Sequence, residues 1–256
     1  MHKKLKIQYC SDLHLEFAQN EEYILEKPII PVADILILAG DIIPFRILDH
    51  QQDFFDYVSR NFEFVYWIPG NHEYYHGDIA GRQGQFEEEI RHNVKLLNNR
   101  WVQHGDTRLI FSTLWTRISQ EYARSIENGM NDFHLIKQGE ARFTVVLYNQ
   151  LFEENMNFIR EAVANNESKN CIVITHHVPT FNNYPSEYLG SSLNEAFAVD
   201  LNDFIEAANI DYWIYGHHHR NVSEFEIGKT KFVTNQLGYV RQGEQRGYST
   251  NKTLVI

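Results

Sequence analysis

The 256-residue chain contains 43% hydrophobic and 22% charged residues, and its 34 acidic and 23 basic residues give a formal net charge of −11. This composition is typical of a soluble globular protein, and the acidic balance argues against unspecific binding to nucleic acid. The lack of a long apolar run argues against an export signal and a membrane span. Cys10 and Cys171 lie in apolar runs, which predicts buried free thiols in a reducing cytoplasm. The length predicts one domain over residues 1–256, and no obligate protein partner is indicated.

Five short runs of β-branched and aromatic residues predict strands, and each run stops in polar residues. In chain order they lie at residues 5–15, 33–41, 64–73, 171–177 and 211–219. Apolar residues that recur at intervals of three and four residues predict helices at residues 48–61, 84–97, 144–165 and 192–209. The acidic Glu87, Glu88 and Glu89 are then expected on a solvated helix face. This alternation predicts an α/β chain, whose sheets collect ligands at the carboxyl ends of their strands.

The first two strand ends carry carboxylates and a histidine. Asp12 and His14 stand two residues apart, so extended backbone would place both on one face, where they can bind the same ion. Asp41 follows Gly40 directly after a buried run, and its two oxygens suit it to bridge two cations. Taken alone, the first pair is weak evidence, and Asp41 is more typical of a helix N-cap or a turn.

The third and fourth strand ends offer further donors. Asn71, in the sequence GNHE, has an amide oxygen, although an asparagine beside Gly70 is also an ordinary turn residue. His176, in the sequence THH, offers a neutral nitrogen, although a lone histidine at a strand end is more often simply hydrogen-bonded.

The fifth strand ends in three consecutive histidines inside the chain, which excludes a terminal purification tag. On extended backbone His217 and His219 share a face, and His218 points away. The candidates form two sets that share one carboxylate: Asp12, His14, Asp41 and His219 for one ion, and Asp41, Asn71, His176 and His217 for the other. Mixed nitrogen and oxygen ligands without a thiolate suit manganese, iron or zinc rather than calcium.

The five blocks SDLH, AGD, GNHE, THH and GHHH, in this order, resemble the calcineurin-like metallophosphoesterases, also called metallo-dependent phosphatases. The segments STLWT, GMNDFHLIK and LGYVRQGEQRGY look like parts of a bacterial branch of that family, so the resemblance covers nearly the whole chain. It implies a four-layer αββα sandwich of two mixed β-sheets flanked by helices, with a dinuclear site at the strand ends. The family pattern G-H-x-H leaves His218 at the variable position, and His176 is the expected ligand of the THH block.

The resemblance also implies a function, the hydrolysis of phosphate monoesters or diesters by two divalent or trivalent ions of manganese, iron or zinc. A metal-bridging hydroxide would attack phosphorus while Asn71 and His72 contact a small phosphorylated substrate, with His72 as general acid or charge stabiliser. Asp132 and His134 are candidates for the substrate side of the cleft. Their alternative roles are a turn cap for Asp132 and an exposed loop position for His134.

Two other classes of function compete with this interpretation. One is a scaffold that keeps the fold but has lost catalysis, which loss of ligands would reveal; here every ligand block and His72 are present. The other is a nuclease of the same superfamily, which needs a basic groove to neutralise backbone phosphates.

Overall fold

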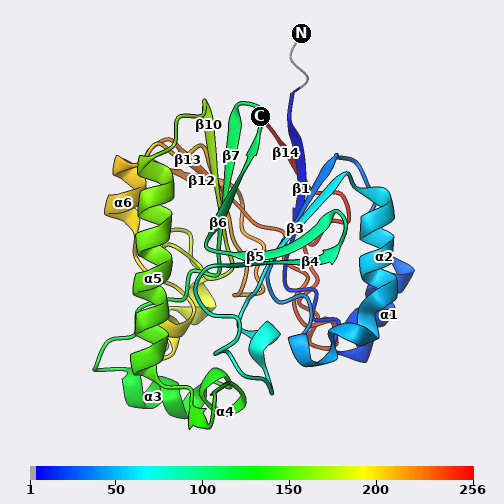
Figure 1. The fold of residues 1–256 in the computed structure, drawn as a ribbon. Coiled ribbons are helices and arrows are strands. Elements are labelled where there is room, and N and C mark those ends of the chain that lie inside the picture. The colour runs from blue at the N-terminus through cyan, green and yellow to red at the C-terminus, as the bar shows by residue number, and fades with distance from the viewer. Residues whose placement is uncertain (1–3) are drawn as a thin grey trace.

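The computed structural model describes residues 4–256 and folds them into two six-stranded sheets packed face to face, with helices on both outer sides (Figure 1). In spatial order the first sheet contains β14 (Thr253–Val255), β1 (Lys6–Cys10), β2 (Ile35–Ala39), β3 (Phe64–Ile68), β5 (Val94–Asn98) and β4 (Phe86–Arg91). The second contains β12 (Phe225–Ile227), β13 (Thr230–Val233), β11 (Tyr212–Ile214), β10 (Asn170–Thr175), β7 (Thr107–Ser112) and β6 (Arg100–His104). Both sheets are mixed, since four central parallel strands are flanked by an antiparallel strand at each edge. The predicted αββα architecture is confirmed.

The buried strands alternate between two apolar environments, because successive side chains of a strand point to opposite faces. In β2, Ile35 and Ile37 pack between the two sheets, and Leu36 and Leu38 pack toward the outer helices. The second sheet repeats this arrangement in β10. Full burial of each such aliphatic side chain contributes about 1.5–3 kcal/mol, so this core holds the strand ends of the two sheets in fixed positions.

Helices α1 (Ala18–Glu26) and α2 (Gln52–Asn61) cover the first sheet, and α5 (Val145–Ala164) and α6 (Asn202–Ala207) lie over the second (Figure 1). The shorter helices are α3 (Ala123–Gly129) and α4 (Asp132–Leu135), and a small two-stranded sheet joins β8 (Lys137–Gln138) to β9 (Ala141–Arg142). The predicted helix at 144–165 is confirmed, with the Thr144 hydroxyl accepting from the Leu147 amide as the N-cap. The helix predicted at 48–61 is confirmed from Gln52 onward, and a 3-10 turn precedes it.

The helix predicted at 84–97 is wrong, because this segment forms the antiparallel strands β4 and β5. β5 joins the sheet beside β3, and this pairing overrides the helical periodicity of the local sequence. The acidic run consequently belongs to an edge strand, where Glu87 forms an ion pair with Lys95 at 2.7 Å. Charged residues on an edge strand oppose pairing with other chains.

The helix predicted at 192–209 is also wrong in extent. Only a 3-10 turn at Asn194–Ala196 and the short α6 are helical. Between them, the backbone of residues 197–199 pairs with Val178, whose amide donates to Phe197 O at 3.1 Å and whose carbonyl accepts from Val199 N at 3.0 Å. A backbone that pairs in this extended way cannot continue a helix.

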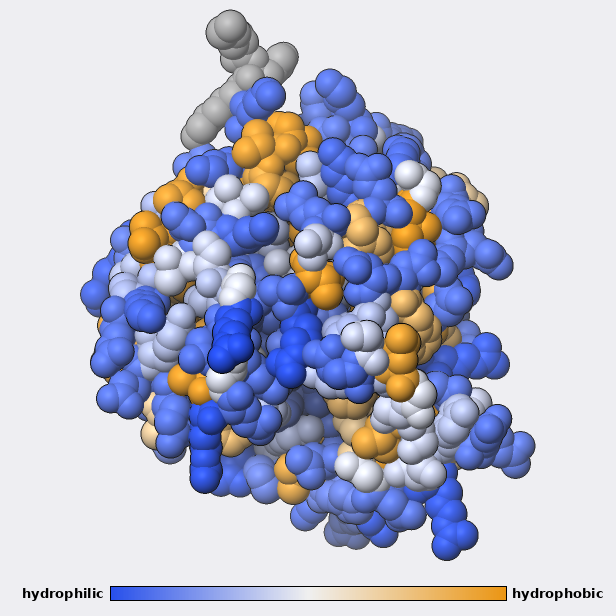
Figure 2. Space-filling view, turned by 180° about the vertical axis from the view of Figure 1, so that it is seen from behind, coloured by the Kyte–Doolittle hydropathy of each residue, from blue (hydrophilic) through white to orange (hydrophobic). Residues whose placement is uncertain are grey.

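The five predicted strands are confirmed as β1, β2, β3, β10 and β11. The surface seen from behind is mostly hydrophilic, with hydrophobic residues scattered over it (Figure 2). Within residues 4–256, none of the helices combines the length and the apolar character that crossing a membrane requires.

Candidate metal centre and active site

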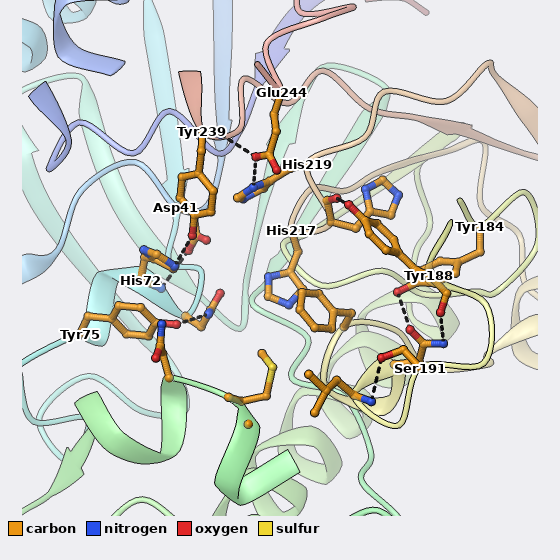
Figure 3. A pocket seen from close by; sticks show the side chains of 18 residues that line it. Asp41, His72, Tyr75, Tyr184, Tyr188, Ser191, His217, His219, Tyr239 and Glu244 are labelled. Carbon is orange, nitrogen blue, oxygen red and sulfur yellow. Dashed lines mark hydrogen bonds and ion pairs between the residues drawn. The ribbon is translucent and has the colours of Figure 1, made fainter. Parts of the chain in front are cut away.

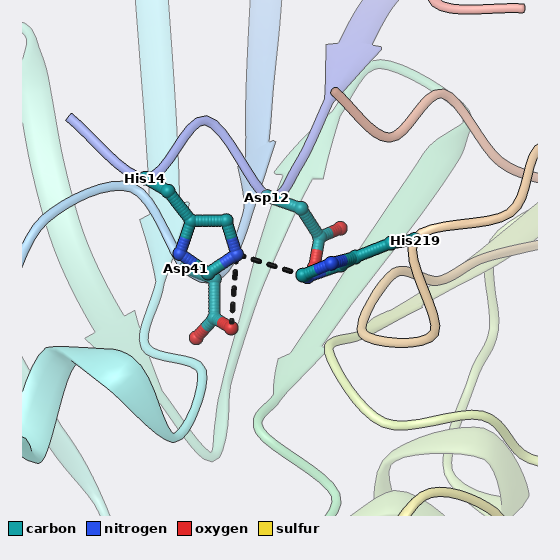
Figure 4. Close-up of side chains that lie close together, drawn as sticks. All are labelled: Asp12, His14, Asp41 and His219. Carbon is teal, nitrogen blue, oxygen red and sulfur yellow. Dashed lines mark hydrogen bonds and ion pairs between the residues drawn. The ribbon is translucent and has the colours of Figure 1, made fainter. Parts of the chain in front are cut away.

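Four side chains from three strand ends converge at the junction of the two sheets (Figure 4). The Nε2 atoms of His14 and His219 lie 2.9 Å apart. Asp12 Oδ1 lies 3.4 Å from His219 Nε2, and Asp41 Oδ2 lies 3.8 Å from His14 Nε2. One donor atom from each residue lies within 4.8 Å of the others. This set, the first cluster, is the one that the sequence assigns to one ion.

A second cluster shares Asp41 with the first. Asp41 Oδ2 lies 3.4 Å from His176 Nε2, and this histidine nitrogen lies 3.1 Å from His217 Nδ1. The amide oxygen of Asn71 lies 3.3 Å from the same His176 nitrogen. The other oxygen of Asp41, Oδ1, accepts a hydrogen bond from the His72 backbone N–H at 2.9 Å. Asp41 Oδ2 therefore faces histidine nitrogens of both clusters, which is the position of a bridging ligand.

Each of the four rings in the clusters has its other nitrogen beside a fixed acceptor. The pairs are His14 Nδ1 with Glu16 Oε1 at 3.2 Å, His219 Nδ1 with Glu244 Oε2 at 2.8 Å, His176 Nδ1 with Ala39 O at 3.0 Å, and His217 Nε2 with Ala196 O at 3.3 Å. Carboxylates and carbonyls can only accept, so each ring donates its N–H there and directs the lone pair of its remaining nitrogen into the cluster. Neutral imidazole nitrogens and carboxylate oxygens that converge in this way fit a transition-metal centre.

The backbone at the candidate ligands differs from the sequence expectation. Five of them adopt positive φ angles: Asp12 at 56°, His14 at 48°, Asp41 at 55°, His217 at 77° and His219 at 54°. Strand β11 ends before the histidines, so side-chain alternation along extended backbone is the wrong reason for their shared direction. Left-handed backbone at a residue other than glycine costs on the order of 1–3 kcal/mol and is concentrated at functional sites.

Glycines beside the ligands allow the loops to approach closely. A Cβ atom on Gly70 would collide with Asp41 Oδ1 and with the ring of His176, and one on Gly216 would collide with the Asp12 carboxylate. These glycines therefore supply the space in which the two sheets bring their ligands together.

The clusters carry fixed negative charge. Burial lowers the pKa of His219, but Asp12 and Glu244 outweigh this effect and raise the pKa to about 10. Burial likewise lowers the pKa of His176, and Asp41 outweighs it and raises the pKa to about 9. Burial raises the pKa of Asp41, whereas the surrounding histidines, His176 first, hold that pKa well below its usual value. Asp41 therefore stays ionised, and protons compete with metal cations for the two histidines.

His72 lies at the start of a 3-10 turn and faces the same space. Its Nδ1 donates to Glu16 Oε1 at 2.9 Å, and its Nε2 lies 3.2 Å from the Tyr239 hydroxyl. Burial lowers the pKa of His72, but Asp41 and Glu16 outweigh it, so the pKa is raised. Glu16 was not predicted from the sequence as a site residue, and its carboxylate accepts from the rings of both His14 and His72. The spacing of Asp12, His14 and Glu16 at alternate positions was the available signal.

Glu73 is a second residue that the sequence analysis missed. Its buried carboxylate accepts four N–H groups: Asp41 N at 2.9 Å, Ile42 N at 2.7 Å, Gly70 N at 2.7 Å and Trp67 Nε1 at 3.1 Å. These bonds join the loop after β2 to the loop after β3. Glu73 thereby fixes Asp41 relative to the neighbouring ligand loop.

The two candidate substrate-binding residues of α4, Asp132 and His134, lie in different environments in the structure. Asp132 is buried, and its Oδ1 accepts from Asn71 Nδ2 at 2.9 Å and from Tyr75 OH at 2.7 Å, so it lies behind Asn71 and orients that amide. His134 is exposed, and its Nε2 donates to Asn128 O at 3.2 Å outside the cavity. Residues two apart on one helical turn point in nearly opposite directions, which explains why α4 does not bring both to the cleft.

A profile of the family described as calcineurin-like phosphoesterase matches residues 5–221. A protein of Acanthamoeba polyphaga mimivirus, described as uncharacterized, is 33% identical over 262 residues, which cover 91% of this chain and 91% of its own. The chain belongs to the calcineurin-like phosphoesterases. The solved structure of the phosphopantetheinyl hydrolase PptH from Mycobacterium tuberculosis has the same fold, with a TM-score of 0.71 and 16% identity over 99% of this chain and 97% of its own.

This phosphoesterase is a metal-dependent hydrolase, and its family implies a dinuclear metal centre. The two clusters that share Asp41 have the donor chemistry for such a centre. A cavity of about 430 Å³ opens beside them, with His72 and Tyr75 on one side and Tyr184 and Tyr188 on the other (Figure 3). Its lining includes Asp41, Asn71, His217 and His219. A substrate in this cavity reaches donors of both clusters.

Proposed function

We propose that this phosphoesterase hydrolyses small phosphate esters with two ions of manganese, iron or zinc. The proposed ligands are Asp12, His14, Asp41 and His219 for one ion, and Asp41, Asn71, His176 and His217 for the other. The observation that carries the proposal is the position of Asp41 Oδ2, which faces histidine nitrogens of both clusters. When bound, two ions sharing such a bridge activate water and neutralise phosphoryl oxygens.

The residues of the chain orient the substrate and supply a proton. Asn71 and His72 line the cavity beside the clusters, so both can contact phosphoryl oxygens. Glu16 accepts from Nδ1 of His72, which leaves Nε2 to protonate the leaving oxygen. The raised pKa of His72, in which Asp41 and Glu16 outweigh burial, favours the protonated ring that a general acid needs.

The competing functions have less support. A nuclease requires cationic side chains along its phosphate path, and the described lining of the cavity contains neither lysine nor arginine. A catalytically silent scaffold predicts lost ligands, whereas all seven candidates lie in the two clusters with His72 beside them.

A hydrolysis panel with added manganese tests the proposal. It contains p-nitrophenyl phosphate, bis(p-nitrophenyl) phosphate and 3′,5′-cyclic nucleotides, which separate monoesterase from diesterase activity. Release of p-nitrophenol that requires the metal and is lost in the Asp41→Asn variant is the expected result. Retention of full activity after exhaustive chelation would contradict the metal-dependent reaction.

A further inference from the structure

The cavity beside the clusters has an apolar and aromatic wall that adjoins the histidine block, where Phe197 packs on the His217 ring with 4.8 Å between centroids. Tyr184, Tyr188, Leu193 and Phe197 come from the segment between β10 and α6, and Met130 faces them from the end of α3. The volume of about 430 Å³ lies in the range of pockets that enclose small organic ligands.

The wall is held in place by its own hydrogen bonds. Asn194 Nδ2 donates to Tyr188 O at 2.7 Å, and the hydroxyl of Tyr184 reaches Asn194 Oδ1 at 3.5 Å. The Tyr188 hydroxyl lies 3.4 Å from the carbonyl of His218, which connects the wall to the histidine block. These hydrogen bonds fix the aromatic side chains of the wall relative to the histidine block.

The charges of the wall itself disfavour a second anion. Among the described lining residues there is no lysine or arginine, and the ionised side chains besides the histidines are the carboxylates of Asp41 and Glu244. The Arg220 guanidinium lies 5.8 Å from the ring centroid of Tyr188, but it is already paired with Glu187 at 3.0 Å and with Glu244 at 3.9 Å. A carboxylate or second phosphate placed against the wall would lose its hydration and would have to compete with Glu187 and Glu244 for Arg220.

We infer that this wall binds the organic group of the substrate and selects phosphate esters whose organic group is neutral and apolar or aromatic. Esters that carry a second anionic group, such as polyphosphates or carboxylated esters, are discriminated against. The inference rests on the proposed function, because the metal centre must hold the phosphoryl group for the organic group to reach the wall. Discrimination then comes from repulsion and unpaired charge as well as from apolar contact.

A matched pair of substrates tests the inference. Phenyl phosphate and 4-carboxyphenyl phosphate differ by one carboxylate that is remote from the ester bond, and both are assayed as monoesters and as methyl diesters with manganese. In whichever ester class is hydrolysed, the wild-type protein should prefer the compound without the carboxylate in kcat/KM by about tenfold or more. Equal kcat/KM values would overturn the inference and leave the proposed function intact. No metal-dependent hydrolysis of any of these compounds would overturn both.

A charge introduced into the wall provides the second test. Leu193→Arg should reduce the preference for the ester without the carboxylate by about fivefold or more, because the new cation pairs with the carboxylate of the other ester. Leu25→Arg is the matched control, since Leu25 is 74% exposed on α1, and it should keep the wild-type preference. Metal content shows whether each variant is folded. An unchanged preference in a Leu193→Arg protein with full metal content would contradict the inference, and the wild-type comparison decides it if that variant does not fold.

Discussion

Replacement of each of the three consecutive histidines by alanine should have very different effects on metal binding and kcat. His217 and His219 each direct a nitrogen into one of the two clusters. Removing a direct ligand weakens metal binding and misplaces the activated water, so each variant should lose at least about a hundredfold in kcat. That factor corresponds to about 2.7 kcal/mol of transition-state stabilisation.

His218 should behave differently, because its Nδ1 accepts from Gln236 Nε2 at 3.0 Å and from the Arg220 backbone N–H at 3.2 Å. Its removal leaves the half-buried Arg220 N–H without its acceptor, and the cost should lie near the lower end of the roughly 1–3 kcal/mol that an unsatisfied buried donor costs. Gln236 Nε2 keeps the Arg220 carbonyl and the Thr234 hydroxyl as acceptors. We therefore expect a less stable His218→Ala protein whose kcat falls by less than about tenfold.

Metal content, kcat and the free energy of unfolding in urea should be measured for all three variants. His50→Ala is the matched control, because His50 is exposed on the 3-10 turn before α2. A His218→Ala protein that is as metal-poor and inactive as the other two would refute this division of roles. So would a His217→Ala or His219→Ala protein with normal metal content and turnover.

Other side chains of the centre give distinct outcomes. Asp41→Asn should lower the content of both ions, because it removes the charge of the shared ligand. His72→Ala should lower turnover while both ions stay bound, and loss of metal in this variant would contradict the role of His72 as an acid. Glu16→Gln should lower kcat by about tenfold with little change in KM, because Nδ1 of His72 loses its anionic acceptor, and an unchanged kcat would count against this. Burial raises the pKa of Glu16, but His14 and His72 outweigh it and hold the pKa at about 2, below its ordinary 4.5. A carboxyl group whose pKa is lower in the folded than in the unfolded state stabilises the fold at a pH above its unfolded pKa. The free energy of unfolding of the metal-free protein should therefore fall as the pH is lowered from 4.5 to 2, and it should fall less steeply in Glu16→Gln.

The sequence predicts the strand ends well because each ligand block directly follows an apolar run. His176, for example, directly follows β10, and Asp41 follows β2 with only Gly40 between them. The fixed order of the blocks identifies the family. The local sequence does not predict the backbone conformation of these residues. Asp12 and His217 both adopt positive φ, and the His217 N–H donates to the Asp12 carboxylate at 3.0 Å, a contact between distant parts of the chain that periodicity cannot detect.

The wrong elements have the same origin. The segment 84–97 contains helix-forming residues at helical spacing, yet β5 pairs with β3, a contact outside the local window. The cavity wall was unpredictable for a related reason. Tyr184 and Met130 are about fifty residues apart in the sequence, and only the packing of the loop after β10 against the end of α3 brings them to one cavity.

The stoichiometry of bound metal tests the central claim most directly. The purified chain should be stripped by chelation, reloaded with manganese, freed of excess ion and analysed for metal per chain alongside its hydrolytic activity. A centre in which Asp41 Oδ2 bridges the two clusters predicts two ions per chain, with activity lost on stripping and restored on reloading. A firm value of one ion per chain in the fully active protein would contradict the bridged centre.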